Sequence, residues 1–119
     1  MIEIARVYDH PNKSAKSSSR YLVERLWPRG MKKESLQLDG WLKDIAPSNA
    51  LRKWYAHKVE RWPEFRQRYL AELRKNSDAL QPLLEAARRG NVTLLYSARA
   101  TEHNSALILS DLLRSKLRR

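Results

Sequence analysis

Two short segments of this sequence hold residues whose types and spacing could do chemistry. The first spans residues 97–104 and includes Arg99, Glu102 and His103, directly after an apolar run. A guanidinium matches the geometry of phosphate or carboxylate, and an imidazole exchanges protons near neutral pH. We interpret His103 as a candidate general acid or base, oriented by Glu102 or Asn104, with the reaction type left open.

The second segment, E-R-L-W-P-R-G, places Arg25 and Arg29 at the end of another predicted strand. If the two strands are parallel neighbours, both arginines meet Arg99 at the same edge of the sheet, where open α/β sheets bind ligands. Three guanidiniums there would bind an anionic, phosphate-bearing ligand, with Ser97 and Asn104 orienting it. The sequence therefore predicts a ligand-binding site at the strand ends.

Both segments also have a purely structural interpretation, which the sequence leaves open. In it, Ser97 or Thr101 caps the following helix, Glu102 complements the helix dipole and His103 is a surface residue. Trp27 then packs into the core, and the arginines pair with Glu24, Asp39 or Asp44. Whether the protein is an enzyme or a binding protein is undecided at this point.

These segments need elements that position them. Apolar and β-branched residues predict strands over residues 2–8 and 20–26, joined by a polar surface loop over residues 9–19. The uninterrupted apolar run 92–96 is typical of a strand covered on both faces, so it is our candidate central strand.

Helices are predicted around this last strand. Apolar spacing predicts one helix within residues 32–45, although Gly40 weakens it, and Ser48 is placed to cap a short helix. Pro63 suits the first turn of the next helix, which has an apolar stripe at Trp62, Phe65, Tyr69 and Leu73. Asn76-Ser77 is placed to cap another helix that ends at Arg88-Arg89-Gly90, and a last helix follows the polar segment 97–104.

This element order predicts one domain over residues 1–119 with an α/β fold. We expect a small, compact, layered domain with a short, mainly parallel sheet and about four to five helices. No run approaches the roughly 20 apolar residues of a membrane helix, and the N-terminus does not resemble a signal peptide. We therefore expect a cytoplasmic protein with no membrane partner.

Composition narrows the chemistry and suggests an anionic partner. The 119 residues include no cysteine, which excludes disulfides, thiolate metal sites and a cysteine nucleophile. His10, His57 and His103 are far apart without acidic residues at ligand spacing, so we expect no dedicated metal site, and no motif identifies a cofactor. The 24 Lys and Arg against 13 Asp and Glu give a formal net charge of +11, which attracts phosphates and nucleic acids.

The charge supports an alternative function, a nucleic-acid-binding module without sequence preference or catalysis. Residues 52–75 interleave aromatic residues with eight Lys or Arg and three Glu, a composition that can stack bases and bind phosphates. The spacing of Trp62, Phe65 and Tyr69, however, places these three rings on one helix face, which favours a core role for them and a solvated basic face behind.

Several motifs together resemble a known family. They are V-E-R-L-W-P-R-G (residues 23–30), W-L-K-D-I-A-P-S (41–48), V-T-L-L-Y-S-A-R (92–99) and E-H-N (102–104). The combination closely resembles the YeaO-like branch of the domain of unknown function 488 family, uncharacterised bacterial proteins. The resemblance implies a small cytoplasmic α/β protein and no particular reaction. Longer relatives carry cysteines at the positions of Tyr96 and Asn104, so their thiol or metal chemistry does not carry over.

Overall fold

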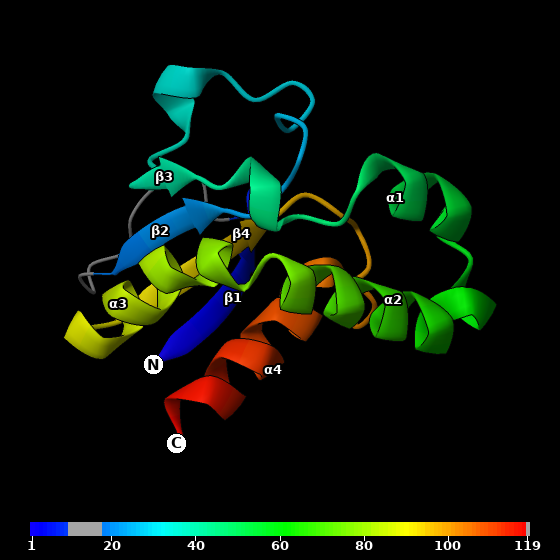
Figure 1. Cartoon of the computed structure of the whole chain (residues 1–119). Coiled ribbons are helices and arrows are strands. Elements are labelled where there is room, and N and C mark those ends of the chain that lie inside the picture. The colour runs from blue at the N-terminus through cyan, green and yellow to red at the C-terminus, as the bar shows by residue number, and fades with distance from the viewer. Residues whose placement is uncertain (10–17, 119) are drawn as a thin grey trace.

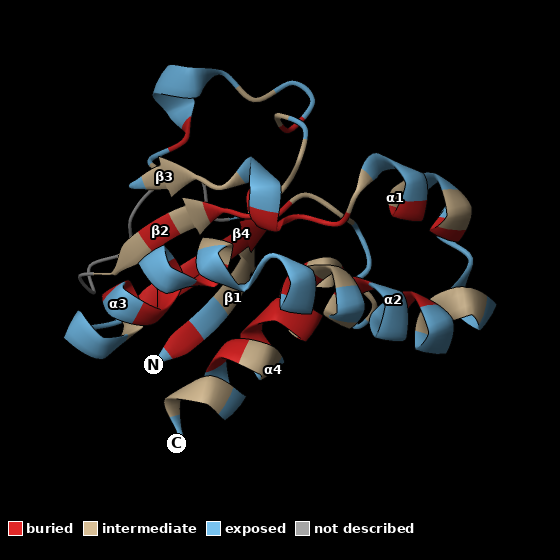
Figure 2. Cartoon of the chain, in the orientation of Figure 1, coloured by how far each residue is buried: buried red, intermediate tan, exposed pale blue. Residues whose placement is uncertain are grey.

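The computed structural model describes residues 1–9 and 18–118, and most of the predicted loop 9–19 lies outside them. In the described part the sheet has four strands, all parallel, in the order β1-β4-β2-β3 (Figure 1). The strands are β1 (Ile2–Arg6), β2 (Ser19–Leu22), β3 (Gly40–Trp41) and β4 (Val92–Tyr96). The predicted central strand is confirmed, because β4 lies between β1 and β2 and every residue in it is buried (Figure 2).

Side chains alternate along these strands, so the sheet contributes to two hydrophobic clusters. Leu94 belongs to the first cluster, which also contains Ile2 of β1 and the buried residues of the helices. Leu95 belongs to the second cluster together with Leu22 of β2. Residues 27–41 cover this second cluster with partly buried apolar side chains, among them Trp27, Met31, Leu38 and Trp41.

The four described α-helices confirm the predicted α/β class. They are α1 (Asn49–Tyr55), α2 (Trp62–Lys75), α3 (Gln81–Arg89) and α4 (Ser105–Leu117). Helices α3 and α4 contact β4 and each other, and α4 also contacts β1. No described helix has the length and apolar character needed to cross a membrane.

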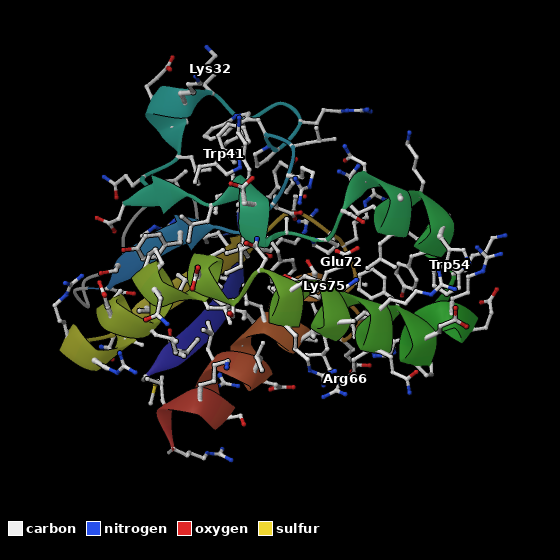
Figure 3. All side chains as sticks on the ribbon, viewed as in Figure 1. Lys32, Trp41, Trp54, Arg66, Glu72 and Lys75 are labelled. Carbon is white, nitrogen blue, oxygen red and sulfur yellow. The ribbon has the colours of Figure 1, made fainter. Side chains whose placement is uncertain are left out.

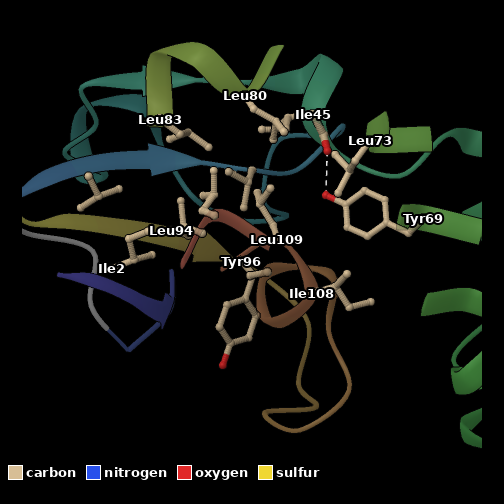
Figure 4. Close-up of a cluster of buried hydrophobic side chains, with 14 of the residues drawn as sticks. Ile2, Ile45, Tyr69, Leu73, Leu80, Leu83, Leu94, Tyr96, Ile108 and Leu109 are labelled. Carbon is tan, nitrogen blue, oxygen red and sulfur yellow. Dashed lines mark hydrogen bonds between the residues drawn. The ribbon is translucent and has the colours of Figure 1, made fainter. Parts of the chain in front are cut away.

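Local signals place the start and the buried face of two helices as predicted. The hydroxyl of Ser48 accepts a hydrogen bond from the Leu51 N–H at 3.2 Å and so caps α1. Pro63 lies in the first turn of α2, where its missing N–H costs nothing. In the stripe of α2, Phe65, Tyr69 and Leu73 are buried and Trp62 is partly buried. The Tyr69 hydroxyl donates to the Ile45 carbonyl at 2.7 Å (Figure 4).

The helix predicted within residues 32–45 is wrong. That segment forms two short 3₁₀ turns, Lys33–Ser35 and Lys43–Ile45, separated by the edge strand β3. Gly40 pairs with Tyr21 of β2 instead of lying in a helix. Glycine suits this position, because a Cβ there would lie 3.2 Å from the Tyr21 ring.

The predicted cap at residues 76–77 is also wrong. A 3₁₀ turn, Ser77–Leu80, precedes α3, and the Asn76 side chain donates instead to the Asp44 carbonyl at 3.1 Å. The end of α3 is as predicted, with Arg88 and Arg89 in its last turn and Gly90 directly after it.

Candidate functional site at the strand ends

Strands β2 and β4 are parallel neighbours, so the two predicted site segments follow them at the same edge of the sheet. After β4 the chain continues into α4, which packs in the first hydrophobic cluster. After β2, residues 27–41 cover the second cluster on the other side of the sheet. In open α/β sheets, ligands usually bind in a crevice outside the strand ends where the connections of neighbouring strands leave toward opposite faces.

Glu24 joins the ends of β2 and β4 at this position. Its Oε1 accepts hydrogen bonds from the Ser97 backbone N–H at 2.7 Å and from the Ser97 hydroxyl at 2.9 Å. The Glu24 carbonyl in turn accepts from the indole N–H of Trp41 at 2.6 Å. Ser97 is therefore bound to the protein itself, and Glu24, which the sequence suggested only as a partner for arginine, connects the ends of β2 and β4.

Arg25 is half-buried and directed to backbone oxygens. Its Nε donates to the Pro47 carbonyl at 3.1 Å, and its terminal NH2 group donates to the Ala46 carbonyl at 2.9 Å. These bonds attach the segment after β2 to the loop that leads into α1. The Arg25 guanidinium thus supports the fold at this edge, whatever else it binds.

Asn104 caps α4, where the structural interpretation had expected Ser97 or Thr101. Its Oδ1 accepts from the Leu107 N–H at 3.1 Å, while its Nδ2 donates to the carbonyls of Ala100 at 2.9 Å and Thr101 at 3.3 Å. Asn104 is 5% exposed, so these bonds occupy both ends of a buried amide. The cap also fixes the shape of the segment 97–104.

The two predicted catalytic residues lie apart from this network. The His103 ring packs edge-on against Trp62 of α2, with 5.1 Å between ring centroids and 87° between planes. Glu102 is exposed. Within the described residues, no hydrogen bond joins His103 to Glu102 or to Asn104, and the catalytic roles of His103 and Glu102 stay predictions.

Arg29 and Arg99 are the predicted ligand arginines that stay exposed. They flank a structural pair that the sequence did not reveal, Arg6 and Tyr8, at the end of β1. The Tyr8 hydroxyl donates to the Arg29 carbonyl at 2.7 Å, and the Arg6 Nε donates to the Ala98 carbonyl at 3.1 Å. The Arg6 guanidinium also lies 4.7 Å from the centre of the Tyr8 ring. These contacts join all three segments at the sheet edge.

Below this edge, the core holds a tyrosine with a shifted pKa. Burial, reinforced by the nearby carboxylates of Glu24 and Glu72, raises the pKa of Tyr69 above its ordinary value. Its hydroxyl donates to the Ile45 carbonyl, so Tyr69 is a packing residue of the core. Among the described residues, no group of three or more His, Asp or Glu is placed to hold a metal ion.

A second polar feature lies away from the strand ends, on α1 and α2. The Trp54 ring is half-buried, and the guanidiniums of Arg61 and Arg68 lie 5.2 Å and 4.3 Å from its centre. Figure 3 shows Trp54 and Lys75 along the side of α2 that faces α1, and Arg66 on the side that points away. This surface belongs to the basic, aromatic stretch of the sequence. Unlike the aromatic rings of the core, its tryptophan is partly exposed.

Comparison with known proteins places the whole chain in a family. The uncharacterised protein YeaO of Escherichia coli is 46% identical over 114 residues, which cover 96% of this chain and 97% of that protein. The uncharacterised protein Rv3073c of Mycobacterium tuberculosis is 37% identical over 115 residues, which cover 97% and 95%. No solved structure matches the chain significantly. A family description that reads "Inactive DUF488-N3 subclade" matches residues 1–119, so the chain belongs to the DUF488 family, as its motifs predicted.

Proposed function

We propose that this protein is a non-catalytic, cytoplasmic binding domain, and that its ligand is a nucleic acid bound by exposed basic side chains on a layered α/β scaffold. The observation that carries the proposal is the set of unpaired cations on α1, α2 and the turn between them. Among the described residues, Lys53, Lys58 and Lys75 are exposed and take part in no ion pair. Together with a net charge of +11, such side chains attract polyanions at long range.

The strand ends support the non-catalytic part of the proposal. The polar groups that a ligand would need there are bonded within the protein: Ser97 to Glu24, Arg25 to two carbonyls, and Asn104 to the α4 cap. A carboxylate at the strand ends also repels an anion. The description of the matched subclade as inactive agrees with this interpretation.

A salt titration tests the proposal. Fluorescence anisotropy with a labelled oligonucleotide should show binding at 50 mM salt that weakens steeply toward 200 mM, because each phosphate contact releases counterions. With about four contacts to a single strand, the slope of log affinity against log salt is roughly −3. Absence of binding at 50 mM salt, or binding that does not change with salt, would contradict the proposal.

A second candidate is a phosphate-bearing small molecule at the strand ends. It is favoured by the exposure of Arg29 and Arg99 beside the strand ends, where Arg6 adds a third guanidinium. A variant with Arg29→Gln and Arg99→Gln separates the candidates. If it retains salt-dependent binding of the oligonucleotide, the basic surface is the site, whereas loss of that binding together with loss of a thermal shift by phosphorylated compounds assigns the site to the strand ends.

A further inference from the structure

We propose that the groove between α1 and α2 binds single-stranded nucleic acid, with an unpaired base stacked on Trp54 and Arg68. This inference rests on the proposed function, and it specifies the surface and the form of nucleic acid. It uses residues that lie away from the strand ends and outside the main core stripe of α2.

The groove has basic side chains along one wall. It encloses about 330 Å³ and is lined by both helices, with Leu51 from α1 and Arg68 and Lys75 from α2. Glu72 also lines it, but Glu72 is bonded to the start of α1: Oε1 accepts from the Ser48 N–H at 2.9 Å and Oε2 from the Ser48 hydroxyl at 2.6 Å. These bonds direct the Glu72 carboxylate to the α1 cap, and Arg68 and Lys75 are the cations that line the groove.

Trp54 and the two guanidiniums that lie over its ring, those of Arg61 and Arg68, provide the stacking surface beside this groove. The Arg68 guanidinium, 4.3 Å from the ring centre, also pairs with Glu64 one turn earlier on α2. Arg61 donates to the Trp54 carbonyl, which holds the end of α1 against the turn before α2. Aromatic rings and guanidinium planes are the two side-chain surfaces on which unpaired bases stack in proteins that bind single strands.

The shared position of Arg68 connects the two parts of the proposed site. It covers Trp54 and also lines the groove that leads to Lys75. A strand that stacks one base at Trp54 can therefore place its following phosphates near Arg68 and Lys75. The exposed Lys53, next to Trp54 on α1, adds a further cation at the same end.

The geometry favours a single strand over a duplex. Bases inside a duplex are stacked on their neighbours and leave no free face for a tryptophan, while an unpaired base offers one. An acidic peptide would use the cations but gain nothing from the ring, so dependence on Trp54 separates the two kinds of ligand.

The test is a set of anisotropy titrations with the full chain, a labelled 12-nucleotide single-stranded RNA and a 12-base-pair duplex of the same sequence. We expect the single strand to bind more tightly at 50 mM salt. Trp54→Leu should weaken single-strand binding at least about fivefold, because a stacked base contributes that much or more. Trp54→Phe, which keeps a stacking ring, should retain most of the affinity.

A matched pair of charge variants controls for electrostatics and for folding. Arg68→Gln removes a cation from the groove, while Arg66→Gln removes one from the other side of the same helix (Figure 3). Arg68→Gln should weaken single-strand binding several-fold more than Arg66→Gln, with circular dichroism confirming that each variant is folded. This comparison stands even if Trp54→Leu does not fold.

The outcomes distinguish the two proposals. If the unchanged protein binds neither oligonucleotide, the proposed function is wrong. If it binds both with salt dependence, but Arg68→Gln and Arg66→Gln have equal effects or the duplex binds as tightly as the single strand, the groove proposal is wrong and the basic surface stands. Displacement of the RNA by polyglutamate of the same charge, with no effect of Trp54→Phe or Trp54→Leu, would also overturn it.

Discussion

Replacing Glu24 should loosen the sheet edge where the ends of β2 and β4 meet. In Glu24→Ala, the Ser97 N–H and hydroxyl both lose their acceptor, and the ends of β2 and β4 lose the side chain that joins them. A hydrogen bond to a charged group contributes about 1.5–3 kcal/mol at most, and about 1 kcal/mol is reasonable for each at this half-exposed position. We therefore expect the free energy of unfolding to fall by about 2 kcal/mol.

The length of the chain gives the corresponding change in melting temperature. An entropy of unfolding of about 2.1 cal/mol/K per residue gives about 0.25 kcal/mol/K for a chain of this length, so 2 kcal/mol corresponds to about 8 °C. Glu24→Gln should cost about half as much, because the amide oxygen can still accept both hydrogen bonds but carries no charge.

Urea denaturation followed by circular dichroism measures this loss. Glu85→Ala is the matched control, since Glu85 is exposed on α3 and has no contact at the strand ends. A double-mutant cycle with Ser97→Ala isolates the interaction, for which we expect a coupling of about 1 kcal/mol. Values for Glu24→Ala within about 0.5 kcal/mol of the unchanged protein would refute the bridge between the strand ends.

Three further predictions concern groups that hold the scaffold. The pKa of Tyr69 is raised by burial and by the carboxylates of Glu24 and Glu72, so the unfolded chain loses the Tyr69 proton at a lower pH than the folded protein does. The stability that Tyr69 contributes is therefore present below about pH 10 and declines above it. Urea titrations at alkaline pH should show a shallower decline of the free energy of unfolding for Tyr69→Phe. Asn104→Ala removes the α4 cap and should lower the free energy of unfolding by about 1 kcal/mol, measured by chemical denaturation; an unchanged value would show that the cap is dispensable. Ala56→Gly should raise it by about 0.5 kcal/mol, because φ is 47° there, and a lower melting temperature would contradict this.

Local and periodic signals in the sequence were sufficient for much of the fold. The uninterrupted apolar run of β4 and the stripe of α2 identify their elements because burial on both faces or on one face leaves a distinct pattern. Residues 32–45 were predicted as a helix from their apolar spacing. The same spacing also fits short turns whose side chains pack into the two hydrophobic clusters. The deciding interaction is the pairing of Gly40 and Trp41 with β2, a contact between segments that are distant in sequence.

The candidate site was located by topology but not resolved by residue type. The prediction that β2 and β4 are parallel neighbours is confirmed, so both polar segments do end at one edge of the sheet. Residue types cannot show whether a donor faces a ligand or the protein: the amide of Asn104 suits a cap as well as a ligand. The roles of Arg29 and Arg99 in binding stay predictions, and Glu24 was missed because its partner lies 73 residues away.

Nuclear magnetic resonance of the 15N-labelled chain, titrated with a short single-stranded RNA, tests the central claim most directly. We predict salt-dependent shifts of amide signals concentrated in α1 and α2, with the indole signal of Trp54 among the largest. Shifts confined to residues 24–30 and 97–104 would contradict the claim, since they would place the ligand at the strand ends that Glu24 joins.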